Sequence, residues 1–235
     1  MNDDVQKKID ELVKDSDLFI ASPDTIERIQ RKGLPIKSVF TTYQEYLDKL
    51  FVEKRGLATD LIQKLPRLDD SIANGSVTAL YEELKETFVL GIPGASIVLA
   101  ILLFDLAAKF RLHKESIRKN AQASWKSIED LHLKDVICKL REHGAITEKE
   151  EKELLEFNKK IRNNYLHYNI QKLVKDMILG ELKSVNVETG KVTTEKNVKP
   201  ADRPYLWFSA KRVLDKQTVV DRVTFCIGWV NKFLA

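Results

Sequence analysis

Residues 161–169 combine the side chains that a protein needs to cleave a phosphodiester bond. They read IRNNYLHYN and include Arg162, Asn163 and His167. An arginine guanidinium binds phosphate through a planar fork of N–H donors. A histidine imidazole gives or takes a proton near neutral pH, which suits it to general acid–base catalysis. The motif therefore predicts acid–base chemistry at a phosphate, with these three residues as the catalytic group and no metal ion.

The residues around the motif are basic. From Phe157 to Lys175 the chain contains no Asp or Glu, and such a segment attracts a polyanion. An alternative is a solvated helix face, because acidic residues at 148–151 begin the same helix and this charge distribution suits the helix dipole. We expect RNA contacts from a set of side chains near the motif, namely Lys159, Lys160, Tyr168, Lys172 and Lys175.

The motif residues do not share one face of a regular α-helix. Asn163 and His167 lie about 40° apart around the axis, so Asn163 could hydrogen-bond the imidazole and orient it. Arg162 lies about 140° from His167, and one straight helix would struggle to present both side chains to a single phosphate. A bend in the helix or a two-fold dimer, in which two motif helices meet at one groove, would solve this problem.

The composition is that of a globular protein with room for one large or two small domains. The chain has 235 residues, 43% apolar content and a net charge of +4, which permits nucleic acid as a partner without arguing for it. Cys138 and Cys226 form no CxxC pair, so we expect reduced thiols in a cytoplasmic protein. With His132 and His143, Cys138 matches no common zinc spacing, and we predict neither metal nor cofactor.

One apolar stretch, residues 88–104, raises the question of a membrane. A spanning helix needs about 20 apolar residues, whereas this stretch is interrupted by Gly91, Pro93 and Gly94 and followed by Asp105. We predict a core helix that starts near Pro93, with a membrane-attached regulator as the weaker alternative. Asp105 is expected to pair with Lys109 one helical turn later, and a place beside the active groove is the alternative for it.

Helical patterns dominate the rest of the chain. Residues 1–70 suggest short helices, one of which should end near Gly56, and we assign them to an N-terminal extension. Residues 71–235 predict an all-α, up-and-down bundle, with a small β-hairpin near 184–195 around Thr189-Gly190. Helix starts are expected at Ser76, at Thr147 through a capping box with Glu150, and after Pro204.

The order of these features resembles the HEPN superfamily of helical-bundle proteins, many of which are ribonucleases. Three elements carry the resemblance: GIPGAS at 91–96 before the apolar helix, LKDVICKLREHGAITEKEEKELLEF at 133–157, and the Arg162, Asn163, His167 motif. They cover roughly residues 76–178. Some family members are silenced by nucleotide transfer to a tyrosine two residues after the histidine. Here Asn169 takes that place and Tyr168 directly follows His167, so this control is not expected.

The resemblance implies a dimeric nuclease that cuts RNA through the RNA's own 2′-hydroxyl, with the site at the subunit interface. His167 would then move the proton, Arg162 would hold the phosphate, and Asn163 would position them. A toxin or defence effector with an antitoxin or other regulatory protein as partner fits this expectation. The alternative is a non-catalytic module of the same fold that binds RNA, nucleotide or protein. The aromatic residues Trp125, Trp229 and 205–208 are expected in the core or a dimer interface, with base stacking as the alternative.

Overall fold

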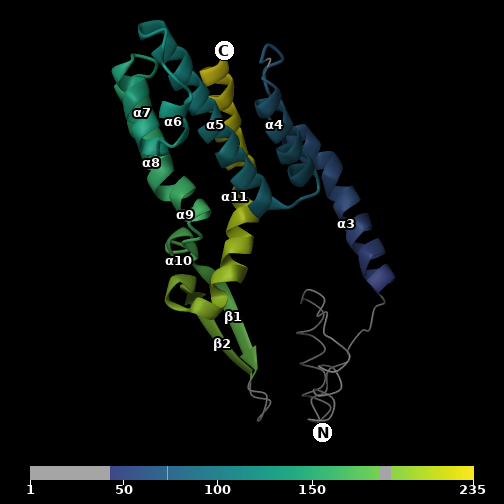
Figure 1. Cartoon of the computed structure of the whole chain (residues 1–235). Helices are drawn as coiled ribbons and strands as arrows, with labels where there is room; N and C mark the ends of the chain where they lie inside the picture. The colour runs from purple at the N-terminus through teal and green to yellow at the C-terminus, as the bar shows by residue number, and fades with distance from the viewer. Residues whose placement is uncertain (1–42, 73, 186–191) are drawn as a thin grey trace. The chain divides into compact units, whose positions relative to one another are not determined.

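The computed structural model of the chain is mostly helical and describes residues 43–72, 74–185 and 192–235 (Figure 1). The chain divides into two compact units. One comprises Met1–Leu50 and Gly180–Val198, and the other comprises Phe51–Leu179 and Lys199–Ala235. The second unit is a helical bundle, and it contains every predicted site residue.

The helices of the described chain differ widely in length and follow in this order: α3 (Tyr43–Lys64), α4 (Gly75–Val89), α5 (Pro93–Lys119), α6 (Lys126–Glu129), α7 (Leu133–Glu142), α8 (Glu148–Phe157), α9 (Asn163–Leu166), α10 (Ile170–Leu173) and α11 (Trp207–Leu234). A π-helical segment, η1 (Asn158–Arg162), joins α8 to α9. Two 3-10 turns, η2 (Pro200–Asp202) and η3 (Pro204–Leu206), precede α11.

The predicted fold class is confirmed: the described chain is helical apart from one small antiparallel sheet. This sheet pairs β1 (Leu179–Val185) with β2 (Val192–Val198), and the expected turn at Thr189-Gly190 lies outside the described residues. None of the described helices combines the length and the apolar character that crossing a membrane would require.

Helix α5 forms the centre of the bundle, as its apolar sequence predicted. Proline occupies its first turn, where a missing N–H costs nothing. The helix packs against α4, α7 and α11, and Figure 1 shows it running beside α11. Burial on several sides explains why α5 lacks the polar stripe of a surface helix. The core side chains of α5 with no exposed surface are Ile97, Ala100, Ile101, Leu103, Phe104, Ala107 and Ala108.

Residues 51–70 pack on this bundle, although the sequence assigned them to the extension. Leu61, Leu65 and Leu68 contact the core cluster. The Tyr81 hydroxyl donates a hydrogen bond of 2.8 Å to the carbonyl of Pro66, which fixes the chain after α3. The predicted helix end near Gly56 is wrong, because α3 continues through this glycine to Lys64.

The helix caps combine one confirmed and one corrected prediction. The capping box at α8 is present: the Glu150 amide donates to Thr147 Oγ1 at 3.3 Å, and the Thr147 amide donates to Glu150 Oε2 at 2.7 Å. Helix α4 begins differently, because the cap is Asn74 and not Ser76. The Asn74 side chain accepts hydrogen bonds from the amides of Ser76 and Val77 and so satisfies donors that a helix start leaves free.

The Glu150 carboxylate predicts a dependence of stability on pH. An ion pair with Lys232 and the Thr147 amide lower the pKa of Glu150 from 4.5 to about 2. A carboxylate whose folded-state pKa is depressed stabilises the fold above its unfolded pKa and loses that contribution as the pH falls. We therefore expect Glu150→Gln to lower the free energy of unfolding by about 1–2 kcal/mol at pH 6. The deficit should disappear as the pH falls from 4.5 towards 2.

Urea unfolding of the wild type and the variant over this pH range would measure the difference. Glu153→Gln, at an exposed position on the same helix, is the control. A Glu150→Gln deficit that stays constant down to pH 2 would contradict the assigned role of the carboxylate.

Candidate active site

The chain around the motif departs from regular α-helix on both sides of Arg162. In η1 the Asn163 amide bonds to the carbonyl of Asn158, five residues back. Such π-helical turns are rare and occur often at functional sites. Helix α9 then lasts about one turn and ends at His167, whose φ of −97° and ψ of 8° are no longer helical. The sequence predicted a helix from Thr147 through the motif, and the chain is helical from Glu148 to Leu166, with the π-helical segment η1 inside this stretch.

The Arg162 guanidinium is held by two side chains. Its Nη2 lies 3.0 Å from Asp105 Oδ2 on α5, and its Nη1 donates at 3.0 Å to Asn163 Oδ1. The Arg162 and Asp105 side chains are only 16% and 15% exposed, so water screens this ion pair weakly. The predicted pairing of Asp105 with Lys109 is wrong, because Lys109 Nζ donates to the carbonyl of Glu129 instead.

Not all polar atoms of this ion pair are satisfied. Arg162 Nε and Asp105 Oδ1 are buried and have no hydrogen-bond partner within the part of the chain that the structure describes. The same holds for Oδ1 of Asn158, which begins η1 and is 7% exposed. A guanidinium has five N–H donors, so two bonds to the protein leave Arg162 with donors for a further oxygen acceptor.

The His167 side chain is exposed at the end of α9. Among the described residues, no hydrogen bond joins it to Asn163, whose side-chain oxygen accepts from Arg162. Asn163 therefore orients the arginine, whereas the sequence suggested that it would orient the imidazole. The backbone bond from the His167 amide to the carbonyl of Asn163 is of the α type. Arg162 is the last residue of the π-helical turn, and the α-type bond that follows keeps Arg162 and His167 on different faces.

The predicted RNA-binding lysines are all exposed, but they are not equivalent. Lys160 Nζ lies 2.5 Å from Glu156 Oε1 one turn earlier, and this ion pair raises the pKa of Lys160. Its charge is therefore partly balanced within the helix. Lys172 lies on α10, close in sequence to the exposed end of α9.

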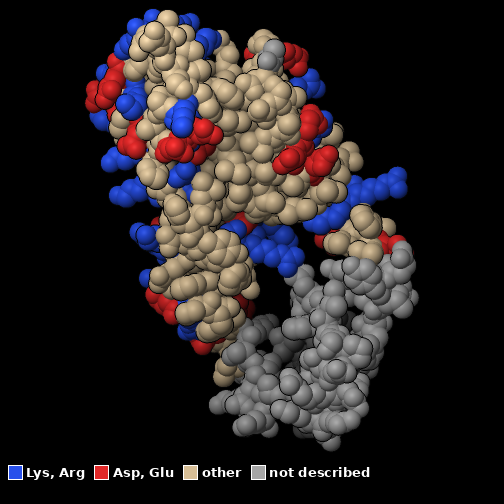
Figure 2. All heavy atoms as spheres, in the orientation of Figure 1, with Lys and Arg blue, Asp and Glu red and all other residues tan. Residues whose placement is uncertain are grey.

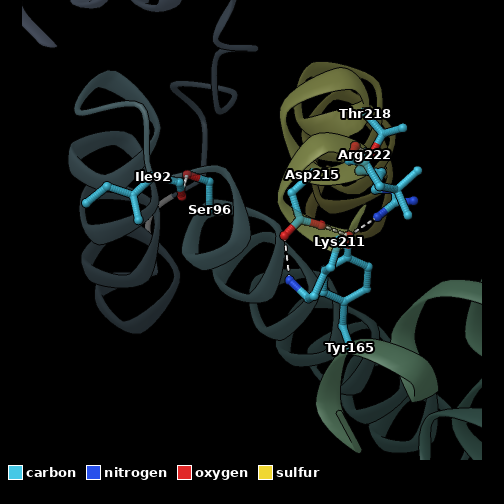
Figure 3. A network of polar contacts seen from close by, with 8 residues as sticks. Ile92, Ser96, Tyr165, Lys211, Asp215, Thr218 and Arg222 are labelled. Atoms are coloured by element: carbon cyan, nitrogen blue, oxygen red, sulfur yellow. Dashed lines mark hydrogen bonds and ion pairs between the residues drawn. The ribbon is translucent and has the colours of Figure 1, made fainter. Parts of the chain in front are cut away.

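A second polar cluster fixes α9 from its buried side (Figure 3). The Tyr165 hydroxyl donates to Asp215 Oδ1 and accepts from Arg222 Nη1, and Lys211 Nζ lies 2.5 Å from Asp215 Oδ2. Burial raises the pKa of Tyr165 well above its usual range, so the phenol stays protonated. Lys211, Asp215 and Arg222 all belong to α11. The cluster therefore ties the motif helix to the last helix of the bundle.

Sequence reasoning missed this cluster, although one signal points to it. Asp215 lies four residues before Val219 and eight before Val223, on the stripe of α11 that the sequence predicted to face inwards. Asp215 is 3% exposed. A carboxylate on a buried stripe needs a cation and a donor nearby, and Lys211 at i−4 could have been recognised as the cation.

Gly94, in the first turn of α5, gives Asp215 room. A Cβ atom at this position would lie 3.1 Å from Asp215 Oδ2 and 3.5 Å from Lys211 Nζ. The first distance is too short for an ordinary contact, so a side chain would have to push the carboxylate aside. This close approach explains one glycine of the GIPGAS segment that precedes the apolar helix.

The aromatic residues before and within α11 are mostly outside the core. Tyr205 is 70% exposed and Phe208 is 62% exposed, so neither belongs to the core, and the dimer interface expected as the other place for them stays a prediction. Trp207 is half-buried and donates from Nε1 to the carbonyl of Ala201 at 3.2 Å. Trp229, by contrast, is 8% exposed and belongs to the core cluster, as expected.

Neither a metal site in the described residues nor a known relative adds to this description of the site. Within residues 43–72, 74–185 and 192–235, no group of three or more His, Cys, Asp or Glu side chains is placed to hold a metal ion. No family model matches the chain, and neither a curated protein nor a solved structure matches it.

Proposed function

We propose that the protein is a metal-independent endoribonuclease with HEPN-like architecture, acting on RNA in the cytoplasm as a toxin or defence effector. The observation that carries the proposal is that one short segment holds both an exposed imidazole, His167, and an arginine, Arg162, that Asp105 and Asn163 hold in place. Both lie in a segment without acidic residues, which suits a phosphate ligand. The resemblance of the motif and its flanking helices to the HEPN superfamily supports the same chemistry.

The proposed reaction moves two protons. An imidazole removes the proton of the 2′-hydroxyl, the 2′-oxygen attacks phosphorus, and the bond to the 5′-oxygen breaks as that oxygen receives a proton. The products are a 2′,3′-cyclic phosphate and a 5′-hydroxyl end. Arg162 opposes the negative charge that builds on the phosphate oxygens in the transition state.

A second copy of the chain would supply the missing acid or base. The motif contains one histidine, and the α-helical bond across α9 keeps Arg162 and His167 on different faces of the helix. In a two-fold dimer, one His167 would act as the base and its counterpart as the acid, with two arginines around one phosphate. We propose this homodimer as the active form.

The test is cleavage of a short RNA in excess chelator, compared with the same strand carrying one 2′-deoxyribose at the cleavage position. We expect cutting of the RNA with a 2′,3′-cyclic phosphate end and an intact deoxy-substituted strand. Cleavage that requires added metal, or equal cleavage of both strands, would exclude the proposed chemistry.

Asp105 is a positioning residue in this proposal, because it contacts the arginine and not the RNA. Asp105→Asn keeps the shape of the side chain but removes the charge that holds the guanidinium. A small displacement of a catalytic group can cost about 10²-fold in rate, and we expect kcat to fall by roughly 10–100-fold with a smaller change in KM. Asp176→Asn, at an exposed position shortly after α10, is the control. Unchanged kcat in Asp105→Asn would show that Arg162 acts without this support.

The same ion pair also favours a second function, a non-catalytic binding module. Arg162 already has a carboxylate partner, and such a pair could serve only to pack η1 against α5. In that case the wild type and His167→Ala would bind RNA, nucleotide or a partner protein equally well, and neither would cut RNA in any buffer.

A further inference from the structure

Two exposed aromatic side chains lie together beside the motif. The ring centroids of Tyr168 and Phe208 are 6.2 Å apart, and the side chains are 63% and 62% exposed. Tyr168 directly follows His167, and Phe208 lies in the first turn of α11. Neither ring contributes to the core cluster. We name this pair, Tyr168 and Phe208, the aromatic pair.

The backbone at Tyr168 suggests that its ring is present for contact with something outside the chain. The residue has φ of 55°, in the left-handed region, where glycine and asparagine are the usual residues and a bulky side chain is strained. The amide of Tyr168 bonds to the carbonyl of Tyr165, and its carbonyl accepts from Ile170, so the turn itself uses only backbone groups. Asparagine would adopt this left-handed conformation with less strain than tyrosine. A strained residue with an exposed ring next to a proposed catalytic group points to a ligand.

The charges around the aromatic pair indicate what kind of ligand it suits. Residues 157–175 and 203–214, which carry the two rings, contain no Asp or Glu. Basic residues lie close to both rings in the sequence: Lys172 comes four residues after Tyr168, and Arg203 comes five residues before Phe208. In Figure 2 the surface over α10 and the beginning of α11 is mainly uncharged, with both basic and acidic side chains at its edges.

We propose that the aromatic pair is a stacking site for an unpaired nucleobase next to the scissile phosphate. This inference rests on the proposed function and makes single-stranded RNA the substrate. An aromatic ring stacks on a base of any type, and nearby cations hold the adjoining phosphates. In a duplex the base faces are already stacked on their neighbours, so the rings would have nothing to bind. Because Tyr168 adjoins His167, the stacked base belongs to a nucleotide beside the reacting one.

The test measures the affinity of the full-length chain for a fluorescent single-stranded RNA of about ten nucleotides by anisotropy. All proteins carry His167→Ala, so that the RNA is not cut during the titration. Phe208→Leu and Tyr168→Asn remove one ring each, while Phe208→Trp and Tyr168→Phe keep an aromatic ring. Phe51→Leu is the matched control, because Phe51 is also 62% exposed but lies on α3.

Loss of one stacking ring is expected to weaken binding by about tenfold or more. The ring-keeping variants and Phe51→Leu should bind within about twofold of their parent. A duplex of the same sequence should bind more weakly than the single strand and should not respond to any of these changes. Tyr168→Asn should unfold at a higher urea concentration than its parent, because asparagine tolerates the left-handed conformation. Weaker binding of this variant therefore could not be attributed to unfolding.

The outcomes separate this inference from the proposed function. If the wild type cuts RNA but Phe208→Leu and Tyr168→Asn bind as tightly as their parent, the stacking site is wrong and the nuclease stands. If the rings matter for binding but the wild type cuts nothing, the stacking site stands and the nuclease is wrong. A wild type that neither binds nor cuts RNA overturns both.

Discussion

Replacing His167 by alanine is expected to slow RNA cleavage by about 10²–10⁴-fold, the usual contribution of general acid–base catalysis. Of the three motif side chains, the histidine is the one whose chemical type suits general acid–base catalysis. His167 is exposed, and among the described residues its side chain takes part in no hydrogen bond or ion pair, so its removal should leave the fold intact. The rate should be followed with a defined RNA in excess chelator, together with urea unfolding of the same samples.

His132→Ala provides the control for this variant. His132 is also an exposed histidine, and it precedes α7 rather than lying in the motif. It should leave cleavage unchanged. Equal activity of His167→Ala and the wild type would remove the histidine from the mechanism.

Mixing an inactive variant with the wild type tests whether the site belongs to a dimer. A dimer of one wild-type and one His167→Ala chain keeps both arginines but only one of the two histidines that the proposed reaction uses as acid and base. We expect the wild-type chains to lose most of their activity after the two proteins are unfolded together and refolded with the variant in excess. Full activity per wild-type chain, with mixed dimers demonstrated, would mean that each site uses the histidine of one chain only.

Removal of the Asp215 carboxylate is expected to have a large effect on stability. Asp215→Ala is expected to lower the free energy of unfolding by about 3–5 kcal/mol, as is typical when one partner of a buried ion pair is removed. Asp215 is 3% exposed and accepts from the Tyr165 hydroxyl and the Lys211 ammonium. Its loss would leave a protonated phenol without its acceptor and a lysine, 14% exposed, without its counter-charge.

Two further variants would identify the cause of this loss. Asp215→Leu combined with Lys211→Met replaces the ion pair by apolar side chains, and we expect it to recover much of the lost stability. Asp221→Ala, at an exposed position on the same helix, should change the free energy of unfolding by less than about 0.5 kcal/mol. If Asp215→Ala were as mild as Asp221→Ala, the cluster would not hold α9 in place.

Local sequence patterns predicted much of the helical architecture. The apolar run after Pro93, the Thr147 capping box and the hairpin each depend on residues close in sequence, and all three are present. Two local predictions of helix ends were wrong, one because the signal was weak and one because two neighbouring residues could both cap the helix. Gly56 costs a helix only about 1 kcal/mol, and α3 continues through it. Asn74 and Ser76 are both good caps. Asn74 has the extended backbone of an N-cap residue, whereas Ser76 already lies inside α4.

At the candidate site, too, local sequence predicted one part and not the other. The residue types at 162–167 predict acid–base chemistry at a phosphate, but they did not show which side chains hold Arg162 and Tyr165. The Asp105–Arg162 and Tyr165–Asp215 contacts join residues 57 and 50 positions apart. Such contacts depend on how each helix is rotated about its axis, which a periodic pattern fixes only approximately. The expected Asp105–Lys109 pair is absent because each side chain has a partner distant in the sequence: Asp105 binds Arg162, and Lys109 donates to the carbonyl of Glu129.

The π-helical turn that ends at Arg162 affects how this sequence aligns with those of other helical proteins. Phe157 before this turn and Tyr165 after it are both buried, and a π-helical turn holds one residue more than an α-helical turn. The wider turn absorbs the additional residue, so the segments before and after it stay in phase with the core. An ungapped alignment with a protein that lacks this turn would displace residues 163–167 by one position. Correct superposition of the two helices requires a one-residue gap within 158–162.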